Sequence, residues 1–190
     1  MNADLLVYQA KAFYNAYIAL DQLSRDDSDT LLLLFAPLVV NGAFSVELAL
    51  KAILAKNQIE YGKEHNLLIL FQMLPKSFQQ ELWAYLIEKA PEYAGSEKGL
   101  DELILLSNAF VDWRYAFEGK PVPAIESRFL AAFANAAVHT MFSYYNADLL
   151  PATKTEPNNE IEQRFHENRE KCKEINLKMI QKLSLIHISE

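Results

Sequence analysis

The feature that most constrains the fold is an apolar run from Leu31 to Leu54, with the sequence LLLLFAPLVVNGAFSVELALKAIL. A helix that is apolar nearly all round has to be covered on every side, by other helices or by lipid. A membrane-spanning helix wants about 20 nearly unbroken apolar residues, whereas Pro37, Asn41, Glu47 and Lys51 interrupt this run. The run therefore predicts the central helix of a protein core and not a membrane anchor.

Covering helices are predicted along the rest of the chain by apolar residues at three- and four-residue steps. The predicted helices span about residues 3–23, 29–57, 65–74, 77–90, 100–118 and 125–148. Pro37 is expected to kink the second of these or to begin a fresh helix, and Ser77 with Gln80 has the spacing of a capping box. Only five glycines interrupt the chain, and strand-like alternation of useful length is absent. The sequence therefore predicts an all-α fold, an up-and-down antiparallel helical bundle with a C-terminal appended helix.

The chain divides by composition into three parts. Residues 1–150 hold the predicted bundle, which Pro151 closes. Residues 151–183 predict a linker and a charged helix, whose sparse apolar residues suit packing on the bundle or against a second subunit. Residues 184–190 belong to the ending KLSLIHISE, which resembles translated sequencing-adapter read-through. Such a non-native tail would carry no evolved function.

Charge and cysteine content limit the partners and the compartment. The formal net charge is -7, so the broad basic surface that non-specific DNA binding needs is not expected, although a small local basic site is compatible with this charge. The single cysteine, Cys172, cannot form an intramolecular disulfide or a CxxC metal site. The start MNADLLVYQAKAF lacks the features of a signal peptide. We therefore expect a cytoplasmic protein.

Common catalytic and metal-binding motifs are absent from the sequence. It contains no phosphate-binding loop, no dinucleotide fingerprint, no HExxH and no GxSxG. The four histidines, His65, His139, His166 and His187, are scattered, so neither a metal site nor a cofactor is expected. His65 stands at a predicted helix start, which favours a solvated or capping role, and His139 lies in NAAVHTMF, which favours a hydrogen-bonded position inside the bundle.

Charged residues among apolar ones are the best candidates for a site. Glu47 precedes Lys51 by four residues, which suits an ion pair within one helix. A buried Glu47 also needs a partner from another helix, and Arg114 is the most attractive one, because a guanidinium can hold a carboxylate by two hydrogen bonds. On one continuous helix, Arg114 and Glu118 border the apolar stripe. That position suits both a structural bridge to Glu47 and a ligand site at a cleft rim or a dimer seam.

Three segments, in this order, resemble the HEPN superfamily of small helical domains. NGAFSVELALKAILAKN is similar to its second-helix signature, KEHNLLILFQMLP resembles the His-plus-Leu segment that follows, and LSNAFVDWRYAFEG resembles its Asn- and Arg-bearing helix. The resemblance implies an up-and-down helical bundle that often dimerises. It also implies a place in prokaryotic conflict systems, such as toxin–antitoxin pairs and antiviral defence.

The resemblance is incomplete at the residues that carry activity. Active members are metal-independent ribonucleases that use an Arg, four to six residues, and then a His, brought together across a dimer. Arg114 matches the Arg and Asn108 a polar position in the same helix, but the His would fall at residues 119–121, where the sequence reads GKP. Cleavage with a ribose 2′-OH needs a group that takes and returns a proton near pH 7. Glu118 is the nearest titratable substitute, and neighbouring Arg114 would push its pKa down.

Two functions follow from these observations. The first is a non-catalytic HEPN-like module that binds a partner protein, a nucleotide or RNA as a homodimer in a defence or toxin–antitoxin system. Its expected binding residues are Arg114, Asn108, Glu47, Lys51 and His65. The alternative is a metal-independent endoribonuclease in which Arg114 acts at a dimer cleft with Glu118, or with a histidine such as His65 or His139. The missing histidine favours the first.

Overall fold

A computed structural model describes residues 3–25, 28–94, 97–115 and 122–145 of the chain. These residues fall in one compact unit, Met1–Ala147. The predicted linker, charged helix and tail, residues 151–190, lie outside the described residues. The elements, in chain order, are α1 (Ala3–Ser24), α2 (Ser28–Lys56), α3 (Leu67–Met73), α4 (Lys76–Lys89), the 3-10 helix η1 (Pro91–Tyr93), α5 (Glu97–Leu106), α6 (Ala109–Arg114) and α7 (Ser127–Tyr145). Because no strand occurs in the described ranges, the predicted all-α fold is confirmed.

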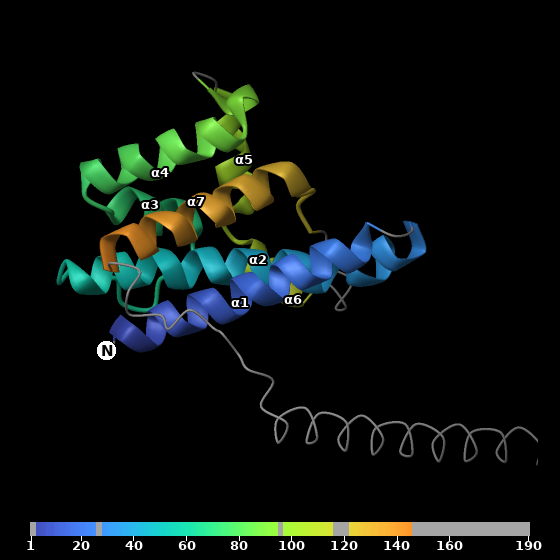
Figure 1. The fold of residues 1–190 in the computed structure, drawn as a ribbon, viewed down its shortest axis with the longest axis horizontal. Helices are drawn as coiled ribbons and strands as arrows, with labels where there is room; N and C mark the ends of the chain where they lie inside the picture. Colours follow the sequence, from blue (N-terminus) through green and yellow to red (C-terminus); the bar gives the residue numbers. More distant parts are fainter. Residues whose placement is uncertain (1–2, 26–27, 95–96, 116–121, 146–190) are drawn as a thin grey trace, which may run out of the picture. The chain divides into compact units, whose positions relative to one another are not determined.

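Helix α2 is the centre of the bundle, as its apolar run predicts. Helices α1, α3, α6 and α7 pack against it, and Figure 1 shows α3 and α7 above α2 in this view, with α1 running below and in front of it. Its fully buried apolar side chains are Val39, Ala43, Val46, Ala49, Leu50, Ala52, Ile53 and Leu54. By length and composition, Leu33–Lys56 could cross a membrane, yet 56% of its apolar window is buried in the bundle. A core helix passes the same test.

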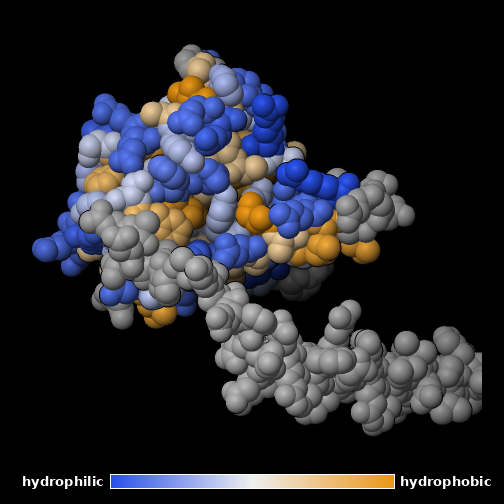
Figure 2. Space-filling view, viewed as in Figure 1, coloured by the Kyte–Doolittle hydropathy of each residue, from blue (hydrophilic) through white to orange (hydrophobic). Residues whose placement is uncertain are grey.

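Helix α2 continues through Pro37 without a new start. Proline removes one backbone donor from a helix, and at this point the Asn41 side chain donates to the Pro37 carbonyl at 2.7 Å. Of the two outcomes expected at Pro37, a kink or a fresh helix, the fresh helix does not occur. Figure 2 shows hydrophobic surface at the connected ends of α1 and α2, where Leu23 and Leu33 are exposed.

Three helices meet closely at Gly42. A Cβ atom at this position would lie 3.0 Å from Tyr17 Cδ2 and 3.1 Å from Leu130 Cδ1 and Cδ2. Tyr17 comes from α1 and Leu130 from α7, and both are buried. The missing side chain thus lets α1 and α7 approach the central helix at one level of the bundle.

The predicted helix over residues 100–118 is two helices, α5 and α6, with a break at Ser107 and Asn108. The Ser107 hydroxyl donates to the Ile104 carbonyl at 2.6 Å, and Leu67 N donates to the Ser107 carbonyl at 2.8 Å. Ser and Asn side chains compete with the helix for backbone partners. The prediction of one helix is therefore wrong. An apolar stripe drawn along one continuous helix from residue 100 to residue 118 does not apply either.

The capping box predicted at Ser77 is also wrong. Helix α4 begins one residue earlier, at Lys76, with Pro75 in the capping position and no side-chain cap. The Gln79 amide donates instead to the carbonyls of Gln72 and Leu74, at 3.0 and 2.7 Å. These bonds join α4 to the end of α3, so the turn is fixed by a glutamine in the first turn and not by the serine.

Candidate functional site

A buried ion pair lies in the middle of the central helix. Glu47 is 1% exposed, and Lys51 Nζ donates to its Oε1 at 2.7 Å. Removing the two charges from water costs roughly several kcal/mol per ion, and only a close, hydrogen-bonded pair offsets that cost. Lys51 also lies 5.5 Å from the centre of the Tyr61 ring. The pair predicted within one helix is confirmed, and both residues are buried, whereas most such pairs are solvated.

His65 is the second partner of Glu47. Its Nδ1 lies 2.9 Å from the same Oε1, and its side chain is 51% exposed. The loop that carries it turns through Gln58 and Gly62, which have φ angles of 58° and 55°. The Glu64 carboxylate then accepts from the backbone N of His65 and of Asn66, at 2.9 and 2.7 Å. These contacts bring the imidazole from the surface onto the buried carboxylate.

The expected bridge from Arg114 to Glu47 is not formed. Oε1 of Glu47 accepts from Lys51 and His65, and no described residue hydrogen bonds to the buried Oε2. An unpaired oxygen of this kind costs about 1–3 kcal/mol. The requirement for a partner from outside the helix was predicted correctly, but a loop histidine meets it.

Arg114 ends α6 and is exposed. Its guanidinium carbon lies 4.8 Å from the ring centre of Phe110 and 4.7 Å from that of Tyr115, which are cation–π distances. Phe110 stacks on Phe44 of α2 with ring centres 4.3 Å apart, and the His65 ring centre lies 6.5 Å from that of Phe110. Phe110 therefore contacts the core, the guanidinium and the imidazole together. Glu118, the other predicted catalytic residue, lies outside the described residues.

Asn108 contacts the His65 loop through its side chain and does not use that side chain to cap α6. It precedes α6 without capping it, and its Oδ1 accepts from Asn66 Nδ2 at 3.0 Å. Asn66 Oδ1 in turn accepts from Ile69 N at 3.1 Å and caps α3. The cap expected of His65 is therefore made by the next residue. This bridge ties the His65 loop to the start of the Arg114 helix.

His139 lies elsewhere. It is exposed on α7, where its ring stacks on that of Tyr85 in α4 with centres 3.9 Å apart and planes 9° apart. The expected position inside the bundle is wrong, because His139 is exposed although Val138 and Thr140 on either side of it in the sequence are buried. His139 has no place in the Glu47 site.

The site combines one carboxylate with two cations and a histidine. Lys51 balances Glu47, and Arg114 adds a second positive charge at the surface. When Nδ1 carries the imidazole proton toward Glu47, Nε2 is left as an acceptor. Such a surface can bind an anion beside exposed rings. Within the described ranges, no group of three or more His, Cys, Asp or Glu side chains is placed to hold a metal ion.

Sequence reasoning missed Asn66 and Phe110. Asn66 carries a readable signal, since Asn before an apolar helix is a strong N-cap. Phe110 carries none, because its aromatic neighbours in NAFVDWRYAF are equally good core residues. Only the break after Ser107 turns Phe110 toward both His65 and Arg114.

Residues 39–120 match the model of the HEPN domain. The matched segment runs from the middle of α2 past the end of α6, and it contains the five predicted binding residues, Glu47, Lys51, His65, Asn108 and Arg114. The chain has no match among curated proteins or among solved structures.

Proposed function

We propose that this chain, whose residues 39–120 match the HEPN domain, is a non-catalytic module that binds single-stranded RNA at one surface. This surface, the Arg114 face, consists of His65, Phe110, Arg114 and Tyr115. The observation that supports it is the exposed guanidinium lying over two aromatic rings, 4.8 and 4.7 Å from their centres.

Of the three expected ligand classes, RNA suits the chemistry of the Arg114 face better than a partner protein or a free nucleotide. Unpaired bases stack on aromatic rings and on guanidinium planes, and a cation beside them attracts the phosphates. Phe110 is braced from behind by Phe44, so its ring is held in place before a ligand arrives. The net charge of -7 confines such binding to a local patch, because the rest of the chain repels phosphates.

The arrangement favours binding over cleavage. A ribonuclease needs a proton-transfer group within hydrogen-bonding reach of the ribose hydroxyl. The residues after Arg114 that would supply a histidine read GKP. His65 shares the ring of Phe110 with Arg114, but its Nδ1 is engaged by a carboxylate that already binds Lys51.

Binding of a fluorescent single-stranded RNA, followed by anisotropy, tests the proposal. Arg114→Gln removes the charge and is expected to weaken binding about tenfold or more, the effect of losing one charge-assisted hydrogen bond or cation–π contact. Lys76→Gln, an exposed cation of α4, is the matched control and should bind as wild type. Equal affinities for all three proteins would exclude the Arg114 face as the binding surface.

A specific observation keeps the metal-independent endoribonuclease as a second candidate. The half-exposed His65 imidazole is oriented by a buried carboxylate, and orientation by a carboxylate is common for catalytic histidines. The same RNA incubated with EDTA should remain intact with the wild-type protein. Cleavage that is lost in both His65→Gln and Arg114→Gln would replace the binding proposal with the enzymatic one.

We also propose that the module acts as a cytoplasmic homodimer in a prokaryotic defence or toxin–antitoxin system. The match to the HEPN domain supports the homodimer, because domains of this family often dimerise. The resemblance to conflict-system members supports the defence or toxin–antitoxin setting. A neighbouring gene for a nucleotidyltransferase or a restriction enzyme would favour this setting, and a conserved neighbourhood of metabolic genes would count against it.

A further inference from the structure

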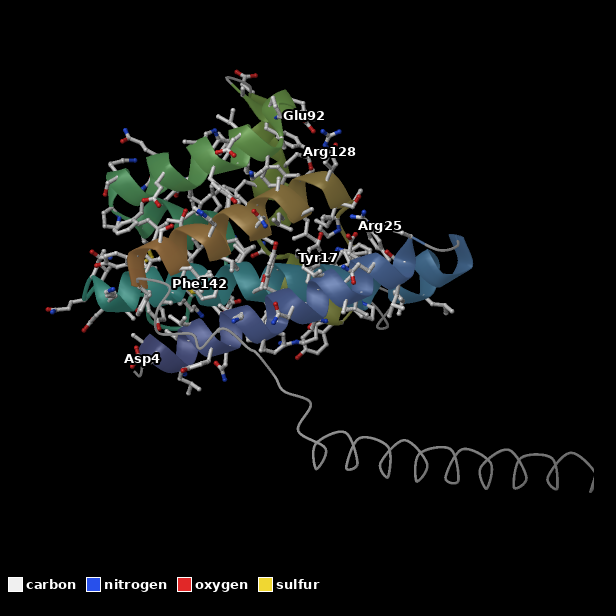
Figure 3. All side chains as sticks on the ribbon, viewed as in Figure 1. Asp4, Tyr17, Arg25, Glu92, Arg128 and Phe142 are labelled. Atoms are coloured by element: carbon white, nitrogen blue, oxygen red, sulfur yellow. The ribbon has the colours of Figure 1, made fainter. Side chains whose placement is uncertain are left out.

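A second candidate site lies on other elements, between α1, α4 and α7. It is an open cavity of about 410 Å³, within the range of roughly 300–1,000 Å³ that small-molecule pockets occupy. Three cations line it, Arg25 of α1, Lys89 of α4 and Arg128 of α7, together with one carboxylate, Asp21. Figure 3 shows Arg25 and Arg128 on the same side of the bundle as Tyr17. None of the cavity's residues belongs to the Arg114 face.

The ion pairs of the cavity's cations leave some of their N–H groups available to a ligand. Arg25 donates through Nε and Nη2 to Asp21, at 3.1 and 2.6 Å, which uses two of its five N–H groups. Lys89 Nζ donates to Glu88 at 2.8 Å, and Arg128 pairs with Glu92. The side chains of Arg25 and Arg128 are 74% and 68% exposed, and exposed pairs contribute little to stability. A ligand oxyanion can therefore bind the outer N–H groups with the pairs left intact.

Aromatic and amide groups form the rest of the wall. Tyr14 and Tyr17 stack with ring centres 6.2 Å apart, and Asn135 Nδ2 donates to the Tyr14 hydroxyl at 2.6 Å. Tyr85 lines the cavity and is held by the His139 ring behind it. Tyr17 is buried behind Tyr14, so the half-buried rings of Tyr14 and Tyr85 offer the flat apolar surface beside the cations. Pockets that combine apolar walls with a few placed polar groups are typical ligand sites.

We propose that this cavity, the α1–α4–α7 pocket, binds a small phosphate monoester that also carries an aromatic ring. The guanidinium groups of Arg25 and Arg128 match the planar, multidentate geometry that phosphate oxygens favour. Lys89 supplies a point charge, and the ring of the ligand packs against the tyrosine wall. The proposal stands independently of RNA binding at the Arg114 face, since the two surfaces share no residue.

Calorimetric titration of the full chain with four probes tests this inference. The probes are phenyl phosphate, adenosine monophosphate, inorganic phosphate and adenosine. At least one of the two ring-bearing phosphates should bind about tenfold more tightly than inorganic phosphate and than adenosine, because only they engage cations and rings together. Binding of adenosine monophosphate alone would point to a nucleotide as the source of the phosphate, and binding of both to an aromatic phosphate in general.

Variants locate the binding. Arg25→Gln and Arg128→Gln should each weaken the tighter probe about tenfold, and because both side chains are mostly exposed, circular dichroism should show an unchanged fold. Arg114→Gln and Lys76→Gln are the controls and should bind as wild type, which also separates this site from the Arg114 face. The inference is overturned if no ring-bearing phosphate binds more tightly than inorganic phosphate, or if the two pocket variants bind as wild type does.

Discussion

At the scale of single residues, Glu47 is the residue that joins the buried central helix to the His65 loop. One of its oxygens accepts from Lys51 and from His65, and both the acid and the lysine are buried. A buried pair of this kind is weak evidence for stability, because a well-packed apolar pair of similar size is often as good. Breaking it from one side is costly, since a charge is then left in the core without its balance.

Lys51→Met is therefore expected to destabilise the protein by about 3–5 kcal/mol. Urea unfolding followed by circular dichroism would measure the loss. The same change at exposed Lys76 is the control and should stay within about 0.5 kcal/mol. Replacing Glu47 by Gln together with Lys51→Met should recover much of the loss, because no uncompensated charge remains. A Lys51→Met protein as stable as the control would mean that Glu47 is not buried as described.

The partners of Glu47 also show what the sequence could and could not predict about the site. The pair with Lys51 was predictable from the four-residue spacing. The need for an outside group was predictable only on the condition that Glu47, which stands among the apolar residues of AFSVELALKAIL, is buried. The identity of that group was not predictable, because nothing in the sequence favours His65 over Arg114 as the partner of Glu47. The choice depends on the turn through Gln58 and Gly62, which no periodicity reveals.

At the scale of elements, α2 and α7 are joined at their ends by Tyr145. Its hydroxyl donates to the Ala52 carbonyl at 2.9 Å, and burial raises the pKa of Tyr145 from its ordinary value near 10 to about 12. The negative charge of nearby Asp4 is the next largest part of this rise. Below pH 10 the phenol is protonated in both the folded and the unfolded chain. Between pH 10 and 12 only the unfolded chain releases the proton, so the stability due to Tyr145 is lost as pH rises through this window.

Tyr145→Phe should consequently cost about 1 kcal/mol at pH 7, the net value of one hydrogen bond. Its free energy of unfolding should also fall less steeply than that of wild type between pH 10 and 12. Burial raises the pKa of Tyr17 and Tyr93 too, so wild type and variant must be compared at each pH. Parallel pH profiles would contradict the assignment.

Gly42 sets the spacing of the three central helices. Gly42→Ala adds a methyl group 3.0 Å from Tyr17 and 3.1 Å from Leu130. Overpacking costs about 1–3 kcal/mol, and the better helix propensity of alanine returns up to about 1 kcal/mol. We expect a net loss of about 1 kcal/mol in urea unfolding. The loss should shrink in a Leu130→Val background, which removes the crowding methyl groups; an unchanged loss would point to another cause.

Element boundaries show where local pattern stops being informative. The extents of α1, α2 and α3 follow from apolar periodicity and end signals, so they were predictable to within two residues. The break between α5 and α6 was not, because the bond from Leu67 N to the Ser107 carbonyl belongs to the tertiary structure. Because the helix ends between Leu106 and Ala109, the positions of residues before Ser107 do not determine the face on which Arg114 lies.

At the scale of the whole molecule, the proposed homodimer is open to direct measurement. Light scattering coupled to size exclusion should give about twice the chain mass of 21.7 kDa. We expect this mass to persist when salt is raised to about 1 M, where charges are screened beyond about 3 Å, because dimer seams rely mainly on apolar contact. A mass equal to one chain at micromolar concentration would contradict the proposal.

Because Oε1 of Glu47 contacts both buried Lys51 and the half-exposed His65, binding at the surface should change the stability of the central helix. A ligand that binds His65 in its contact with Glu47 binds the folded chain and not the unfolded one. Ligand that binds only the folded chain stabilises it by mass action, and the slowest-exchanging amides of a core helix report global opening. Deuterium uptake at Val46 and Leu50, far beneath any ligand, should therefore slow when RNA is added. A mass spectrometer could then detect occupancy of the Arg114 face with no label on either partner.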